Sequence, residues 1–181
     1  MQQNFETPRL ILRPLTLEDA PAIQRLFPHW EIVRFMSSSI PWPYPEDGAH
    51  AFLRDVQLPA MERRGSFCWT IRLKNGPDHL IGTVSLFQRK SENRAFWLAL
   101  PWQSQGIMME ACEPVTDFWF NTLMEPVLIV TKAVDNIGSR RITEKQGGRV
   151  IAGGERAFLC GRRTFEKWEL TREDWNARPR G

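Results

Sequence analysis

The sequence predicts a mixed α/β (α+β) protein, with a twisted, mostly antiparallel sheet, one parallel pair of strands, and helices on both faces. Three observations lead to this expectation. Short β-type runs separated by turn residues are spread along the chain. Segments with helical spacing of apolar residues lie between them. The stretch 96–134 reads strand, helix, strand, an order that implies a right-handed crossover and a parallel pair.

Length and composition indicate one ordinary globular domain spanning residues 1–181, because 42% of the residues are hydrophobic and 25% are charged. The net charge of +3 is small and the basic residues are scattered, so we expect no nucleic-acid partner. Neither the three cysteines nor the three histidines have metal-ligand spacing, so we expect no metal. The sequence shows no signal peptide and no apolar run long enough for a bilayer, which predicts a cytoplasmic protein without membrane contact.

The N-terminal part predicts a strand, two helices and a hairpin. Residues 9–15 form a β-type run, and Thr16 followed by Asp19 resembles a capping box for a helix that ends near residue 26. A second helix should start at residues 45–47, carry Phe52, Leu53 and Val56 on one face, and end or kink at Pro59. Residues 66–73 and 80–88 should pair as a hairpin across the turn-rich segment 74–78.

The segment 27–44 between the two helices is rich in proline and aromatic residues. Its prolines exclude a long regular element. Two interpretations remain open for such a segment: a binding loop, or a surface loop whose rings pack on the core. On the first interpretation, the residues that would contact a substrate are Trp30, Phe35, Trp42 and Tyr44.

The stretch 97–111 is the centre of the prediction. An apolar strand, residues 96–100, stops at Pro101, and a polar turn leads to Gly106. From Ile107 onward the apolar residues take helical spacing. A strand that turns tightly into a helix aims unpaired N–H groups and the positive end of the helix dipole at one point, which favours a phosphate. The alternative is an ordinary strand–helix junction.

The C-terminal part predicts a helix interrupted near residues 110–114 by Pro114, followed by a strand over residues 127–134 that is buried on both faces. Asn136 should cap the next helix, which ends at Gly147 and carries an ion pair between Arg140 and Glu144. Residues 149–159 and 163–170 should form two more strands.

Four stretches together resemble the GNAT (GCN5-related N-acetyltransferase) superfamily, and within it the RimJ/RimL-like branch of ribosomal-protein N-terminal acetyltransferases. They are Glu6–Pro14 (ETPRLILRP), Leu80–Gly82 (LIG), Gln103–Met108 (QSQGIM), and Asn136–Ser139 (NIGS) with Glu144–Gly147 (EKQG). The chain departs from the family pattern at Met108, where the family has glycine or alanine. Thr143 stands where other branches have a tyrosine, and Ala157 where related enzymes of this branch often have a glutamate.

The resemblance implies the fold described above and acetyl-CoA as cosubstrate. It implies that the cofactor contacts come from Gln103, Ser104, Gln105, Gly106, Ile107, Met108, Asn136 and Ser139. It implies Ser139 as donor to the departing thiolate, and it makes Glu155 and Glu110 candidates for the catalytic base. For Ser139 and Glu110, ordinary roles in the first turn of a helix are the alternatives.

The function implied is acetyl-CoA-dependent N-acetylation of a primary amine, most specifically a protein N-terminal α-amine, by direct transfer. Two alternatives stay open: a small-molecule N-acetyltransferase acting on an antibiotic or an amino-acid conjugate, and an acyl-CoA-binding module without turnover. Among the eight tryptophans some should be exposed, which makes a homodimer a further possibility.

Overall fold

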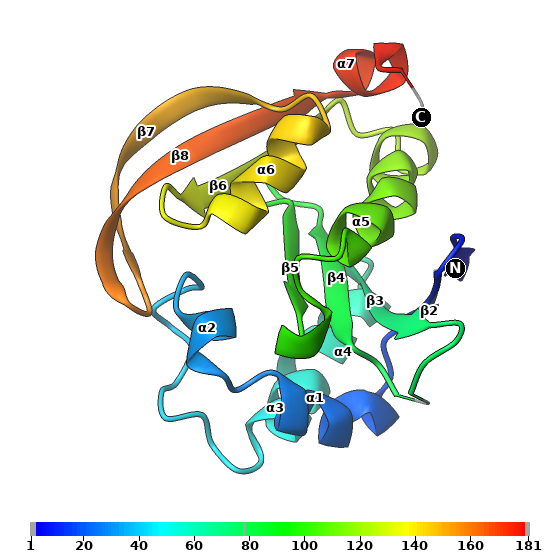
Figure 1. The fold of residues 1–181 in the computed structure, drawn as a ribbon, viewed down its shortest axis with the longest axis vertical. Coiled ribbons are helices and arrows are strands. Elements are labelled where there is room, and N and C mark those ends of the chain that lie inside the picture. Colours follow the sequence, from blue (N-terminus) through cyan, green and yellow to red (C-terminus); the bar gives the residue numbers. More distant parts are fainter. Residues whose placement is uncertain (1–2, 78, 180–181) are drawn as a thin grey trace.

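A computed structural model describes residues 3–77 and 79–179, and within these residues the strands form two antiparallel sheets (Figure 1). The first sheet has the order β1 (Phe5–Glu6), β2 (Leu10–Pro14), β3 (Ser66–Leu73), β4 (Gly82–Phe87), β5 (Arg94–Leu98). The second has the order β6 (Val127–Ala133), β8 (Gly161–Thr171), β7 (Arg149–Phe158). Strands β3, β4 and β5 form an antiparallel meander, which confirms the predicted hairpin of residues 66–73 and 80–88.

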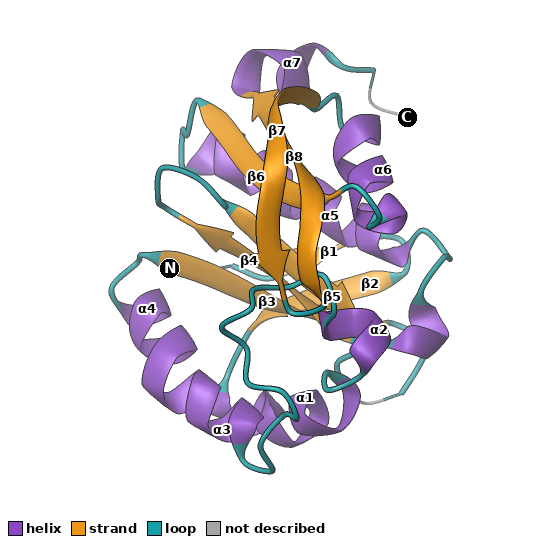
Figure 2. Ribbon diagram, turned by 90° about the vertical axis from the view of Figure 1, so that its left-hand side faces the viewer, coloured by secondary structure: helices purple, strands orange, loops and turns teal. Residues whose placement is uncertain are grey.

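Helices flank both sheets (Figure 2). In chain order they are α1 (Ala20–Leu26), α2 (Trp30–Val33), α3 (Gly48–Phe52), α4 (Leu58–Glu62), α5 (Ile107–Asp117), α6 (Ile137–Lys145) and α7 (Arg172–Ala177). Helices α1, α3 and α4 lie on one side of the first sheet, and α5 lies on the other. None of the described helices has the length and apolar character needed to cross a membrane.

The predicted parallel pair of strands is wrong. Strands β5 and β6 are the facing edges of the two sheets, and the hydrogen bonds between them join Asn93, just before β5, to Ile129, the third residue of β6. Asn93 N–H donates to Ile129 O (2.8 Å) and Ile129 N–H donates to Asn93 Oδ1 (2.7 Å). Because the Asn93 side chain takes the place of the next backbone partner, the ladder stops there and the strands separate. Among the described residues no parallel ladder follows.

The first helical region confirms the capping box, since Asp19 Oδ2 accepts from Thr16 N–H (2.9 Å). The second helix bends differently from the prediction. The chain passes through a π-helical turn at Leu53–Gln57 and continues into α4 across Pro59. This turn rotates the buried face, so Phe52 and Val56 are 49% and 53% exposed while Leu53 is buried. The predicted apolar face was therefore wrong at those two positions. Residue 78 of the predicted hairpin loop lies outside the described residues.

Helix α5 stays helical through Pro114 and changes to a π-helical turn at Phe118–Thr122, so the irregularity lies after the predicted position. Asn136 caps α6, as predicted, by accepting from Ser139 N–H (3.4 Å). The predicted ion pair within α6 is wrong. Arg140 instead binds Glu166 on β8 through Nε (2.8 Å) and Nη2 (3.0 Å).

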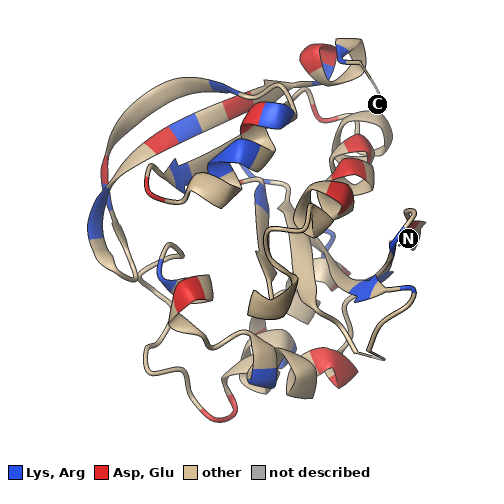
Figure 3. Ribbon diagram, viewed as in Figure 1, with Lys and Arg blue, Asp and Glu red and all other residues tan. Residues whose placement is uncertain are grey.

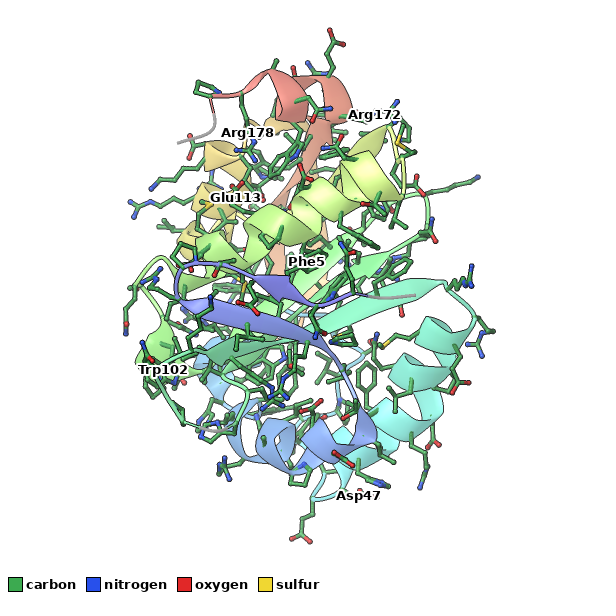
Figure 4. The ribbon with its side chains drawn as sticks, turned by 90° about the vertical axis from the view of Figure 1, so that its right-hand side faces the viewer. Phe5, Asp47, Trp102, Glu113, Arg172 and Arg178 are labelled. Carbon is green, nitrogen blue, oxygen red and sulfur yellow. The ribbon has the colours of Figure 1, made fainter. Side chains whose placement is uncertain are left out.

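The long β7–β8 hairpin arches away from its own sheet and reaches the segment around α2 (Figure 1). Leu159 N–H donates to Met36 O (3.0 Å) and Cys160 N–H to Arg34 O (2.9 Å). At the other end of β8, α7 packs against α5, where Arg178 pairs with Glu113 at 2.6 Å (Figure 4). The hairpin therefore joins the C-terminal half of the chain to the N-terminal half at two distant points.

Candidate active-site cleft between the two sheets

A cleft of about 1040 Å³ opens where β5 and β6 separate. Its walls are β5, β6, the start of α6 and the loop before α5. Its far side is formed by the segment 31–40 and by Arg156 and Phe158 of β7. The docking of the β7–β8 tip on this segment, described above, therefore encloses the cleft on one side. The separation that breaks the sheet is the same feature that creates the cleft.

Each facing strand edge carries backbone groups without a ladder partner. Ala99 N–H donates to Ile81 O across the β4–β5 pair (2.8 Å). The alternation of an antiparallel ladder then turns the N–H groups of Phe96 and Leu98 away from β4, toward the cleft. An unpaired strand edge binds an extended chain through hydrogen bonds. This edge therefore suits an elongated ligand that carries amide groups.

The loop before α5 has the predicted anion-binding geometry. The backbone is left-handed at Ser104 (φ +62°) and at Gly106 (φ +74°). The first intrahelical bond of α5 runs from Glu110 N–H to Gly106 O (3.1 Å), so the N–H groups of Ile107, Met108 and Met109 have no partner inside the helix. At Gly106 the positive φ favours glycine, and the missing Cβ leaves the approach open.

The N-terminus of α6 reaches the same cleft. Asn136 and Ser139 both line it, and the Ser139 side chain lies beside the cap that Asn136 forms. Of the residues predicted to bind the cofactor, Gln103, Ser104, Gly106, Ile107, Met108, Asn136 and Ser139 line the cleft. Gln105 does not, but its carbonyl oxygen accepts from Arg9 Nη1 (3.0 Å), which fixes the loop. The Met108 side chain packs in the core, so its bulk leaves the loop open.

Basic residues outnumber acidic residues in the lining of the cleft. Figure 3 shows Lys and Arg on α6 and at the end of β6. The acidic lining residues are Glu31 and Glu92, and Glu92 is paired with Arg156 (3.0 Å). The basic lining residues are Arg89, Arg94, Lys132, Arg141, Lys145 and Arg156. Such a lining attracts an anionic ligand and disfavours a polycation.

Residues 9–149 match the family model described as the acetyltransferase (GNAT) domain, a match that spans most of the chain. The chain belongs to the GNAT family. It is therefore an acetyltransferase, an acyltransferase enzyme, from a family that uses acetyl-CoA. No curated protein sequence matches the chain.

Solved GNAT structures share the whole fold. A ribosomal-protein-S5-alanine acetyltransferase from Vibrio fischeri is 18% identical with a TM-score of 0.80, over 98% of this chain and 100% of that one. A RimL ribosomal L7/L12 alpha-N-protein acetyltransferase, solved with CoA, is 16% identical with a TM-score of 0.77, over 93% and 98% of the two chains. A spermidine N-acetyltransferase from Vibrio cholerae, solved with CoA and spermine, is 18% identical with a TM-score of 0.76, over 94% and 99%. At these low identities the structural likeness shows the fold alone.

Two buried cations in the cleft of this GNAT enzyme were not anticipated from the sequence. Arg94 on β5 is 3% exposed and Lys132 on β6 is 8% exposed. Arg94 Nη1 donates to Thr116 Oγ1 (2.6 Å) and to Gln146 Oε1 (2.7 Å), whereas its Nε and Nη2 have no partner among the described residues. The sequence signal that could have revealed Lys132 is its position as a single lysine inside the apolar run of residues 127–134, VLIVTKAV.

The two carboxylates considered for the catalytic base lie away from the cleft. Glu155 is on the exposed part of β7, with its side chain 65% exposed and 3.5 Å from Arg162. Glu110 accepts from Thr7 Oγ1 (2.5 Å) and from Arg9 through N–H (2.8 Å) and Nε (2.6 Å). Burial opposes ionisation of Glu110, but these hydrogen bonds outweigh it and lower the pKa of its carboxyl group. Arg9 also donates to the carbonyl oxygen of Gln105, so it links Glu110 to the loop before α5.

The aromatic residues of the segment 27–44 divide into two groups. Phe35 lines the cleft. Tyr44 packs edge-on against Phe27 (5.4 Å between ring centroids), in a core cluster beneath α1 and α3. Trp30 and Trp42 are outside the cleft lining and contact each other (5.6 Å between ring centroids).

Proposed function

We propose that this GNAT enzyme binds acetyl-CoA in the cleft between β5 and β6 and transfers the acetyl group directly to a primary amine, specifically a protein N-terminal α-amine. The observation that carries the proposal is the union, in one cleft, of the anion-binding loop before α5 with two unpaired strand edges. The free N–H groups of Ile107 and Met108 suit a pyrophosphate, and the edge of β5 suits an amide-containing arm.

The side chains that line the cleft complete the arrangement. Asn136 would hydrogen-bond the pantetheine arm, and the Ser139 hydroxyl would donate to the sulfur as the thiolate leaves. Gly106 leaves room for the phosphates, and Arg141 and Lys145 add positive charge on α6. Acetyl transfer to an amine depends mainly on holding the thioester beside a neutral amine, which such a cleft provides.

Direct transfer is favoured over an acetyl-enzyme. Cys112 is fully buried in α5, and burial raises the pKa of its thiol, which suppresses the reactive thiolate. Cys160 lies at the turn between β7 and β8 and is outside the lining of the cleft. A covalent route therefore lacks a suitable cysteine at the walls of the cleft.

The charge of the lining favours a peptide acceptor over a polyamine. A polycation such as spermidine would meet the basic side chains named above, with Glu31 as the acidic lining residue outside the Glu92–Arg156 pair. An N-terminal peptide with acidic residues after its first position would be attracted instead. The tryptophan pair lies outside the cleft, so no aromatic box for a small cation is formed by those residues.

The test is thiol release from acetyl-CoA with a panel of free N-terminal peptides that carry acidic or basic second and third residues, with spermidine as comparison. We expect acetylation of the peptide N-terminus, confirmed by mass spectrometry, and faster turnover of the acidic peptides. Release with spermidine alone would refute the acceptor class. Acetyl-CoA binding without release on any amine would show a binding module instead.

Gly106→Asp is the matched variant for the cofactor site. At a concentration of 100 Kd, acetyl-CoA should stabilise the wild-type protein by about 2.7 kcal/mol, because it binds only the folded state. Gly106→Asp places a carboxylate against the pyrophosphate and should abolish the rise in Tm. An unchanged ligand-induced rise would remove the loop from the site.

A further inference from the structure

We propose that Lys132 is the acid–base residue of the acetyl transfer, accepting the proton that the amine loses and returning it to the thiolate. The inference rests on the proposed function, because it assigns a role within the same cleft. A different base is needed because Glu155 and Glu110 lie away from the cleft, paired with Arg162 and Arg9.

The position of Lys132 places it where the reacting atoms should meet. Its Nζ lies 4.6 Å from the centroid of the Phe96 ring, so the side chain spans the gap from β6 to β5. The free edge of β5 runs from Leu98, next to the anion-binding loop, to Phe96 inside the cleft between β5 and β6. An extended arm that leaves the loop and follows this edge therefore ends beside Lys132.

Every carboxylate near Lys132 is committed to another partner. Glu166 is directly opposite Lys132 on β8, but both of its oxygens are bound by Arg140 of α6. Glu92, at the turn before β5, accepts from Arg156 Nη1 (3.0 Å) and from Thr131 N–H (3.4 Å). Among the described residues Lys132 has no ion pair.

The other charged and titratable groups that act on Lys132 are Arg94 on β5 and Cys112 on α5. Arg141 and Lys145 of α6 line the same cleft. Burial first, and repulsion by Arg94 second, lower the pKa of Lys132 to about 7, against the smaller opposing effects of Cys112 and Glu92. A lysine in this environment exchanges a proton near neutral pH. General acid–base catalysis is most efficient when the pKa of the residue is near the working pH.

The proton and bond changes balance without a further reagent. The neutral amine nitrogen bonds to the thioester carbon, and the carbon–sulfur bond breaks. The nitrogen releases one proton, which neutral Lys132 accepts on Nζ. The thiolate then takes a proton from the Lys132 ammonium, so the products are the acetylated amine and the free thiol of CoA. One residue can serve both atoms because nitrogen and sulfur are bonded to the same carbon during the transfer.

The alternative role for Lys132 is a fixed positive charge or a packing stem. Arginine separates these roles, because a guanidinium keeps the charge but does not deprotonate in proteins. Methionine keeps an unbranched stem of similar length without the amine. Acid–base chemistry requires that both substitutions fail, whereas a fixed charge would be preserved by arginine and a packing stem by methionine.

The experiment measures kcat for Lys132→Met, Lys132→Arg and wild type at saturating acetyl-CoA and saturating N-terminal peptide, across pH 6 to 9. We expect both variants to lose about 10²-fold or more in kcat and to keep the KM for acetyl-CoA. We also expect kcat of the wild type to fall below pH 7, and this fall to be absent in both variants. Lys167→Met is the matched control, because Lys167 lies on the opposite face of the same sheet and outside the cleft lining.

A second measurement follows the ε-carbon NMR signal of Lys132 in the ligand-free wild type, identified by its absence in Lys132→Arg. It should titrate near neutral pH. Wild-type kcat in Lys132→Arg, or a loss below about tenfold in Lys132→Met, would overturn the assignment while leaving the proposed function intact. Absence of turnover by the wild type on every peptide would instead be a failure of the proposed function.

Discussion

Replacement of Lys132 by methionine should stabilise the protein at neutral pH. The pKa of Lys132 is about 7, because burial and Arg94 disfavour its charged form, whereas a free lysine has a pKa of about 10.4. Each pKa unit corresponds to about 1.4 kcal/mol. Because folded Lys132 is still half protonated at pH 7, the cost is slightly below the full difference, and the folded state loses about 4 kcal/mol of stability. Methionine removes the cost and keeps most of the packing, so a gain of about 2–4 kcal/mol is expected.

The pH dependence gives the sharper test. Above pH 7 the unfolded chain still binds a proton that folded Lys132 has lost, so the free energy of unfolding rises with pH. The rise from this one group should be about 1 kcal/mol between pH 7 and pH 8, continuing toward the pKa of the free lysine. The penalty is fully present below the folded pKa of about 7 and fades above it.

The assay is urea unfolding of wild type, Lys132→Met and Lys167→Met at several values between pH 6.5 and pH 8.5. The difference between wild type and Lys132→Met is the measured quantity. Burial raises the pKa of the Cys68 thiol to about 12, so this residue lowers the free energy of unfolding at higher pH. Cys68 is present in both proteins, and its contribution therefore cancels in the difference. If wild type and Lys132→Met had the same free energy of unfolding at every pH, the claim that Lys132 is buried and loses its proton near neutral pH would be refuted.

Three further predictions concern the walls of the cleft. Ser139→Ala should lower kcat by about 10²-fold with little change in acetyl-CoA affinity, and a loss below about tenfold in steady-state kinetics would reduce Ser139 to a helix-terminal serine. Glu110→Gln should weaken acetyl-CoA binding in calorimetry and cost about 1 kcal/mol in urea unfolding, because Arg9 loses its anchor; unchanged affinity would separate this pair from the loop. Phe35→Ala should raise the acceptor KM in the thiol-release assay, whereas Trp42→Ala, outside the cleft lining, should not; the opposite result would move the acceptor site.

The structure also explains how distant parts of the chain form one site. The β7–β8 hairpin docks on residues 34–37, where Ser37 and Phe158 also form an isolated bridge. This contact brings Phe158 and Phe35 to the same side of the cleft. A change at the hairpin tip would therefore alter the acceptor side without touching the anion-binding loop.

Local chemistry was readable from the sequence. The glycine at 106 and the cap at Asn136 were predicted because tight turns and helix caps depend on a few neighbouring residues. The predicted end of the strand at Pro101 was too late, because β5 ends at Leu98 and Pro101 lies in a 3-10 turn, Leu100–Trp102. The strands of the meander and the buried run 127–134 followed from β-type composition. The motifs at residues 6–14, 103–108 and 136–147 were sufficient for the family resemblance, which the GNAT match over residues 9–149 confirms.

Only the tertiary structure decided which side chains reach the cleft. The sequence could not show that Asn93 ends the contact between β5 and β6, because a strand–helix–strand order by itself implies continued pairing. It placed Glu155 and Glu110 by motif position, but their directions depend on Arg162 and Arg9, distant partners set by packing. Lys132 lies within an apolar run, and its environment arises because two sheets, α5 and Arg94 exclude water from a cation without a carboxylate partner. Charge environment is a property of the assembled cleft, and no single segment of the chain contains it.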